Sequence, residues 1–147
     1  MNVTIFTDGG ARGNPGPAAI GVVVLDEVGN ILAKKGKPIG VATNNAAEYG
    51  AVSEALHLIK DELLFRYSPI DSITFVLDSN LVVQQLNGIF KLKNANLRNH
   101  LFTIRSLEIE IHVPIYYTLV PREKNRQADN LVNKALDENR ETLFIKG

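Results

Sequence analysis

The spacing of the apolar residues changes once along the chain, near residue 45, and this change constrains the fold more than any other feature. Before it, β-branched and apolar residues form three short runs, at 3–7, 20–25 and 31–39, separated by polar or glycine-rich turns at 8–17 and 27–30. Short strands with short links predict an antiparallel meander. After it, the apolar residues of 45–65 recur at helical spacing, which predicts a long helix.

The rest of the chain alternates helices and strands. The pattern predicts a strand at 72–77, helices at 81–86 and 96–108, a strand at 111–119 and a last helix at 126–139. Pro114 inside the last strand favours an edge position, because proline cannot donate to a neighbouring strand. The order predicts an α/β fold, with a five-stranded mixed sheet whose first three strands are antiparallel and helices on both faces. We expect one domain over 1–147, with a core at 1–140 and a C-terminal tail at 141–147.

Composition excludes several classes of function. Lys and Arg number 16 and Asp and Glu number 16, so binding to nucleic acid needs a local patch rather than a basic surface. The absence of cysteine excludes a disulfide framework, a Cys-ligated zinc site and thiol catalysis. No apolar run is long enough for a membrane span, and the first residues lack the pattern of a signal peptide, so we expect no membrane association and a cytoplasmic location.

Four acidic residues stand where an α/β sheet gathers its ligands. Asp8 follows the first predicted strand, Glu48 lies in the first turn of the long helix, Asp78 ends the fourth strand, and Asp129 lies near the start of the last helix. Glu48 shares a face with apolar residues and should be partly buried. Clustered carboxylates resist ionisation unless a cation neutralises them, and Mg²⁺ prefers such oxygen ligands. Two ions about 3.5–4 Å apart would suit phosphoryl transfer.

Each acid also has an ordinary structural interpretation. Asp8 could begin an Asx turn, and Asp78 with the following serine could cap a helix. Glu48 and Asp129 could complement helix dipoles. The four together, with their flanking residues, favour the catalytic interpretation.

The chain resembles the type I ribonucleases H, which have the ribonuclease H-like fold. The resemblance covers most of the chain and lies in four segments in the family's order: Thr7-Asp8-Gly9-Gly10-Ala11-Arg12-Gly13-Asn14-Pro15-Gly16, Thr43-Asn44-Asn45-Ala46-Ala47-Glu48, Leu77-Asp78-Ser79, and Ala128-Asp129 with Leu131-Val132-Asn133. The first segment is the most specific, and Asp-Ser alone would mean nothing.

The resemblance implies that Asp8, Glu48, Asp78 and Asp129 are catalytic and hold two Mg²⁺ ions, with Mn²⁺ as a possible substitute. One ion would activate a water, and the other would stabilise the leaving 3′ oxygen. The implied reaction is cleavage of the RNA strand of an RNA–DNA hybrid, which leaves 5′-phosphate and 3′-hydroxyl ends.

The resemblance also implies contacts with the hybrid. The glycine-rich segment would touch the RNA strand, the Thr-Asn-Asn segment would touch DNA phosphates and the minor groove, and a polar residue of the short helix would reach the minor groove. Short amides suit this task, because each can donate to and accept from a 2′-hydroxyl. Asn44 and Asn45 could also simply cap the helix. The expected contact residues are Arg12, Gly13, Asn14, Thr43, Asn44, Asn45 and Gln84.

Two departures from the family stand out. Many relatives carry a histidine in the loop before the last acid, whereas residues 120–125 contain none. Arg122 is the candidate auxiliary residue, since it could contact a scissile phosphate but cannot act as a base, or it could be only solvated. Some relatives also insert a basic helix and loop, and here only Lys91 and Lys93, with the nearby Arg98, could bind phosphates, or they form a plain solvated face.

Two other functions remain open. A nuclease of the same fold with broader specificity, including double-stranded RNA, would share every motif. A non-catalytic hybrid-binding module would not need four converging carboxylates. A small-molecule phosphatase would need a second acid two residues after Asp8, and glycine stands there. We expect the protein to be a monomer.

Overall fold

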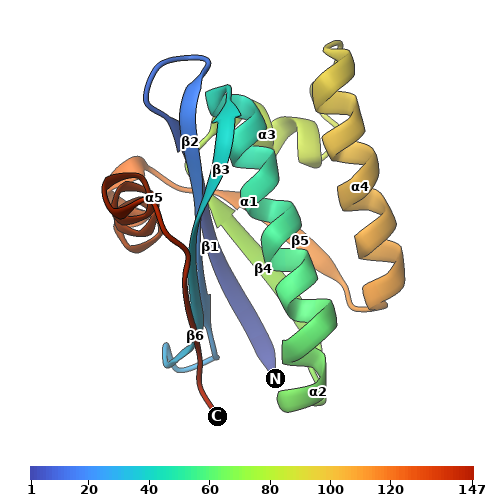
Figure 1. Ribbon diagram of the computed structural model, residues 1–147. Coiled ribbons are helices and arrows are strands. Elements are labelled where there is room, and N and C mark those ends of the chain that lie inside the picture. Colours follow the sequence, from blue (N-terminus) through green and yellow to red (C-terminus); the bar gives the residue numbers. More distant parts are fainter.

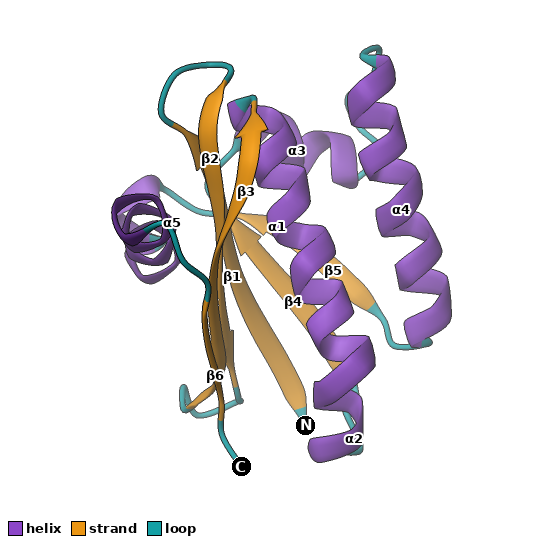
Figure 2. Ribbon diagram, viewed as in Figure 1, coloured by secondary structure: helices purple, strands orange, loops and turns teal.

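The computed structural model describes residues 1–147 as one six-stranded sheet with helices on both faces (Figures 1 and 2). The strand order is β5-β4-β1-β2-β3-β6. The strands are β1 Asn2–Ala11, β2 Gly16–Leu25, β3 Ile31–Ala42, β4 Ser72–Leu77, β5 Ile115–Leu119 and β6 Thr142–Ile145. The helices are α1 Asn44–Leu58, α2 Leu64–Arg66, α3 Asn80–Leu86, α4 Ala95–Ile111 and α5 Arg126–Glu138. A π-helical segment, Ile59–Leu63, joins α1 to α2, and a short 3₁₀ helix, Arg122–Lys124, precedes α5.

The expected antiparallel pairing of β1, β2 and β3 is confirmed, β4 pairs with β1 in parallel, and β5 pairs with β4 in parallel. The expected end of the first strand is wrong. β1 does not stop at Thr7 but continues to Ala11, because Asp8 to Ala11 pair with Gly21 to Ala18 of β2. Asp8 therefore lies inside a strand rather than at the opening of a turn, and the turn itself is confined to residues 12–15.

The boundary between α4 and β5 also differs from the expectation. Ile104, Leu107 and Ile111 are buried on one face of α4, so the helix runs through Ile111 instead of ending at 108. His112 ends the helix in the left-handed conformation, with a φ of 56°. β5 then begins only after Pro114. It lies at an edge of the sheet, as expected from the proline.

A sixth strand replaces part of the expected tail. β6 pairs antiparallel with β3, with Phe144 opposite Lys34. The backbone N–H of Lys146 donates to the Leu32 carbonyl, and the Tyr67 hydroxyl donates to the Lys146 carbonyl. Four residues are too few to show a clear alternating pattern in the sequence, so this strand can be recognised only from its pairing with β3.

The two faces of the sheet are covered differently. α1 lies across the face that carries the main core, with α3 and α4 beside it, whereas α5 covers the other face alone (Figure 1). Tyr49, Leu56 and Phe75 are among the largest fully buried side chains of the main core. Under α5 the buried residues are small, Ala19, Val132 and Ala135, so this helix lies close to the strands. None of the helices is both long and apolar enough to span a membrane.

Candidate active site

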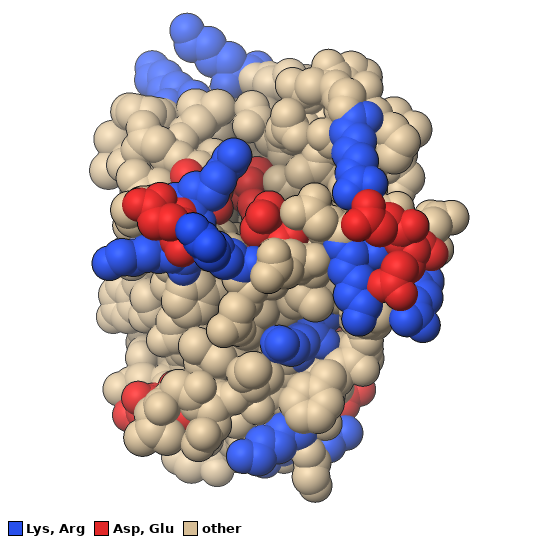
Figure 3. Space-filling view, turned by 90° about the vertical axis from the view of Figure 1, so that its left-hand side faces the viewer, with Lys and Arg blue, Asp and Glu red and all other residues tan.

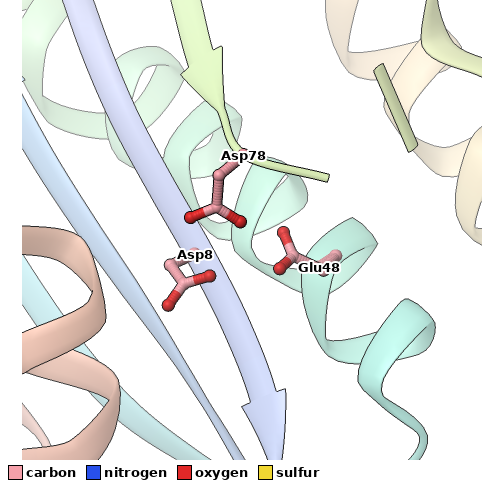
Figure 4. A group of neighbouring side chains, drawn as sticks. All are labelled: Asp8, Glu48 and Asp78. Atoms are coloured by element: carbon pink, nitrogen blue, oxygen red, sulfur yellow. The ribbon is translucent and has the colours of Figure 1, made fainter. Parts of the chain in front are cut away.

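Three acidic side chains from distant parts of the chain meet beside the sheet. Asp8 comes from the second half of β1, Glu48 from α1 and Asp78 from the residue after β4, and their carboxylates point toward one another (Figure 4). One carboxylate oxygen of each lies within 4.8 Å of one oxygen of each of the others. Because β1 and β4 are adjacent and parallel, these two strands bring Asp8 and Asp78 to the same end of the sheet.

Glycine permits the close approach of α1 to β1. A Cβ built on Gly9 would lie 2.2 Å from the backbone carbon and oxygen of Ala47 and 2.5 Å from the Glu48 nitrogen. Real Cβ atoms do not approach backbone this closely, so only glycine fits at this position. The residue after Asp8 thus allows the helix to place Glu48 against the strand.

The structure removes two of the ordinary interpretations of the acids. Glu48 is not in the first turn of α1, which contains no acidic residue, so it lies beyond the reach of the helix-terminal partial charge. The expected first-turn position of Glu48 is therefore wrong, because α1 begins at Asn44 with Thr43 as its cap. Of the Asp78-Ser79 pair that could cap a helix, Ser79 does cap α3, with its hydroxyl accepting from the Val82 N–H, and this leaves the Asp78 carboxylate without a capping role.

The acidic cluster is electrostatically unfavourable by itself. Asp8 and Glu48 are each only 7% exposed, and neither forms an ion pair with a lysine or arginine. Burial raises the pKa of Asp8 to about 7, and the negative charges of Asp78 and Asp129 add to the shift. Burial also raises the pKa of Glu48 well above its ordinary value, with Asp8 adding to it, and Glu48 Oε2 has no hydrogen-bond partner.

Asp129, on α5, lines the same cleft. It lies in the first turn of α5, outside the compact group of three, and its Oδ2 accepts a long bond of 3.4 Å from Asn133 Nδ2. α5 approaches β2 at Gly21, the cross-strand partner of Asp8, where a Cβ would lie 2.2 Å from the Ala128 carbonyl oxygen. The helix that carries Asp129 is thus placed beside the strand pair that carries Asp8.

The four acids line a single open cleft of about 380 Å³. Figure 3 shows acidic side chains recessed into the surface on the α5 side of the molecule, with basic side chains standing beside them. Arg122 and Asn45, both expected at the site, also line it. The full lining is Asp8, Gly9, Gly10, Ala11, Arg12, Asn44, Asn45, Glu48, Asp78, Ser79, Arg122, Asp129, Val132, Asn133 and Leu136.

Asn14 and Asn44 connect the turn at 12–15 to the start of α1 through hydrogen bonds. The Asn44 N–H donates to Asn14 Oδ1 at 3.0 Å, and Asn44 Oδ1 accepts from the Ala11 N–H at 2.8 Å. Gly13 occupies this turn with a φ of +96°, a conformation that glycine adopts without strain. Of the expected contact residues here, Asn44 lines the cleft, whereas Gly13 and Asn14 lie in the adjoining turn, outside the cleft lining.

Other expected contact residues have different surroundings. Arg12 lines the cleft but pairs with Asp137 of α5 at 2.7 Å. Gln84 is half-buried on α3, where its Nε2 donates to Asn80 Oδ1, and it does not line the cleft. Lys91 and Lys93 lie on the connection between α3 and α4, also outside the cleft lining.

Sequence reasoning gave no role to Asn125, which the structure places against the cluster. Its side chain is 1% exposed, and its Nδ2 donates to the Thr7 carbonyl at 2.9 Å and to Asp78 Oδ2 at 3.1 Å. The only local signal is an asparagine immediately before a helix, which is also typical of a simple cap. Its actual partners lie 118 and 47 residues away, beyond any local pattern.

Comparisons with known proteins agree with this geometry. The family model described as "Reverse transcriptase-like" matches residues 6–135. Ribonuclease HI of Halobacterium salinarum is 41% identical over 92% of this chain, and the bifunctional protein Rv2228c of Mycobacterium tuberculosis is 37% identical over 93%. The crystal structure of RNase H1 from Halobacterium salinarum has a TM-score of 0.85 at 40% identity and covers 94% of this chain and 99% of that one.

A further solved structure shows a relative with nucleic acid. LC11-RNase H1 in complex with an RNA/DNA hybrid has a TM-score of 0.85 at 40% identity, over 93% of this chain and 98% of that chain. By sequence, this chain spans 65% of the length of the Halobacterium Ribonuclease HI and 36% of that of the mycobacterial protein. The residues that the family model matches, 6–135, include all four acids.

Proposed function

This chain is a member of the type I ribonuclease H family, and we propose that it is a metal-dependent endonuclease for the RNA strand of RNA–DNA hybrids. The observation that carries the proposal is the group of three carboxylates, Asp8, Glu48 and Asp78, brought together without a cationic partner. Such a group destabilises a protein unless a cation occupies it, so its presence indicates a function. A non-catalytic module would gain nothing from it.

The donor set fits a hard divalent cation. All the candidate ligands are carboxylate oxygens, and Glu48 Oε2 is buried without a protein donor, as expected for an atom that serves as a ligand. We propose that Asp8, Glu48 and Asp78 hold Mg²⁺, with Asp129 completing the site for a second ion, and that Mn²⁺ can substitute. The ions would supply Lewis-acid stabilisation of the attacking and leaving oxygens, with 5′-phosphate and 3′-hydroxyl products.

The remaining cleft residues would bind and orient the hybrid. Asn45 and Asn44 stand on the rim beside the acids and can donate to and accept from the 2′-hydroxyl that distinguishes RNA from DNA. Arg122, which also lines the cleft, can hold a phosphate oxygen through its guanidinium. The guanidinium does not deprotonate, so Arg122 would bind the phosphate rather than act as a base.

A substrate panel tests the proposal. Labelled RNA–DNA hybrid, double-stranded RNA, single-stranded RNA and DNA duplex are incubated with Mg²⁺, with Mn²⁺ or with a chelator. We expect metal-dependent cutting of the RNA strand of the hybrid, lost in Asp8→Asn. Asp71→Asn removes the same charge at an exposed residue whose carboxylate bonds only the N-terminal amine, and this variant should cut normally. Equal cutting of double-stranded RNA would establish broader specificity, and a hybrid bound but never cut would overturn the proposal.

A further inference from the structure

The four acids are carried by elements that pack separately, so something must fix their relative positions. Asp8 and Asp78 are on neighbouring strands, but Asp78 lies in the segment that follows β4, outside the regular strand. Asp129 is on α5, which covers the opposite face of the sheet from α1. The buried residues under α5 form a cluster separate from the main core under α1, so no shared core ties the helix of Asp129 to the helix of Glu48.

One buried residue, Asn125, contacts the parts that carry three of the four acids, Asp8, Asp78 and Asp129. Through its side chain, Asn125 donates both to the Thr7 carbonyl, next to Asp8, and to the Asp78 carboxylate. Through its backbone, its carbonyl accepts from the Asp129 N–H at 3.2 Å, and its N–H donates to the Arg122 carbonyl at 2.9 Å. No other residue has direct hydrogen bonds to this combination of elements.

The side-chain bonds require an amide. Thr7 offers a carbonyl oxygen and Asp78 a carboxylate oxygen, and both can only accept. The Nδ2 group supplies two N–H donors in one plane, whereas a carboxylate in its place would have none. Asn125 Oδ1 is buried and has no partner, so the donated bonds alone determine how the amide is turned.

We propose that Asn125 is a positioning residue, whose amide holds the Asp78 carboxylate toward Asp8 and Glu48 while its backbone fixes the start of the helix that carries Asp129. This inference rests on the proposed function and deepens it. Asn125 is buried and does not line the cleft, so it acts through the acids without touching the hybrid. Groups that orient metal ligands in this way affect metal affinity or activity by about 10–100-fold.

The test uses two variants and a matched control. Asn125→Asp keeps the size and the backbone bonds but removes both N–H donors, and Asn125→Ala removes the side chain. The control is Asn87→Ala, since Asn87 Nδ2 also donates to a backbone carbonyl, that of Tyr117 at 3.2 Å, away from the cleft. We measure Mg²⁺ and Mn²⁺ binding by calorimetry without substrate, thermal unfolding, and kcat and KM for hybrid cleavage.

We expect both Asn125 variants to bind metal about 10–100-fold more weakly, with kcat lowered and KM for the hybrid nearly unchanged at limiting metal. Asn87→Ala should lose some stability while its metal affinity and kcat stay normal. Folded Asn125 variants with wild-type metal affinity and kcat would overturn the inference, as would losses that only follow the unfolded fraction. If the wild type itself neither binds metal nor cuts hybrid, the proposed function has failed instead.

A measurement on the wild type covers the case in which the variants do not fold. The side-chain amide signals of Asn125 in an NMR spectrum should shift when Mg²⁺ is added, because the metal would draw charge from the carboxylate that they contact. Those of Asn87 should stay in place. Asn125 signals that do not respond, in a protein shown to bind Mg²⁺ by calorimetry, would contradict the positioning role.

Discussion

Two glutamates on the same helix have opposite environments. Glu54 of α1 accepts from Lys35 Nζ at 2.8 Å and from Lys37 Nζ at 2.9 Å, and these lysines hold its pKa below the ordinary value against the opposing effect of burial. Glu48, six residues earlier, faces Asp8 and Asp78 and has no cation, so its pKa is raised. Both glutamates face the sheet, but only Glu54 forms ion pairs with lysines.

The difference separates a structural acid from a functional one. The chain neutralises a partly buried carboxylate where β3 supplies lysines, so the lack of such partners at Glu48 is not a general property of this fold. Buried acids without counter-charges lower stability and are retained where a ligand supplies the charge. The contrast between Glu48 and Glu54 therefore predicts opposite responses to the same chemical change.

The largest expected effect follows from removing the charge at the functional glutamate. Glu48→Gln should lower kcat for hybrid cleavage at least about a thousandfold, because it removes a ligand of the ion site. The metal-free variant should be as stable as the wild type at pH 8 or more stable, since a buried unpaired charge is gone. Cleavage assays and thermal unfolding measure both quantities. A variant that loses activity only because it unfolds would place Glu48 with Glu54 as a structural acid.

The contact between α1 and β1 should be next in magnitude. Gly9→Ala would place a methyl group 2.2 Å from the Ala47 backbone, so α1 must move away from β1 and take Glu48 with it. We expect a loss of about 3 kcal/mol in unfolding free energy, as for severe overpacking, and weaker metal binding. Gly10→Ala is the matched control for folding, because the nearest atom to its Cβ would be Val132 Cγ1 at 3.8 Å. Equal stability of the two variants would show that α1 is not fixed by this contact.

The pH dependence of stability should differ between the two acidic sites. Because the pKa of Asp8 is raised to about 7 when folded, the native state keeps its proton between about pH 4 and 7, and without metal its stability falls as pH rises through this window. The loss amounts to a few kcal/mol, since one pKa unit is worth about 1.4 kcal/mol. Mg²⁺ should raise the Tm at pH 8 much more than at pH 5. Thermal unfolding with and without Mg²⁺ at both pH values checks this, and an equal effect at both would exclude the carboxylate cluster as the binding site.

Long periodic segments account for what the sequence predicted of the fold. The meander, the long helix, β4 and α5 were all identified, because each presents enough residues for its period to be recognised. The errors fall where a long-range partner determines the structure. β1 continues beyond Asp8 because it pairs with β2. α4 extends to Ile111 because that residue is buried against the core. Residues 142–145 form a strand because they pair with β3.

The same limit applies to the site. The acids could be found because each stands in a short recognisable segment, and the structure brings three of them into one group with Asp129 lining the same cleft. Asn125 could not be found in this way, because its partners are distant in sequence. Nor could the pairing of Glu54 be predicted, since it depends on the register that places Lys35 and Lys37 beside α1.

The smallest expected effect is at the structural glutamate. Glu54→Gln should leave hybrid cleavage and metal affinity unchanged and lower the unfolding free energy by about 1 kcal/mol at pH 7, as for a partly exposed ion pair. Because the folded pKa of Glu54 is lowered, its contribution is present above the ordinary glutamate range and is lost as pH falls through the folded value. The variant and the wild type should therefore converge in stability in acid. Chemical denaturation at pH 7 and below pH 4 measures the difference. A large loss of cleavage in this variant would remove the contrast with Glu48, because both glutamates would then serve the active site.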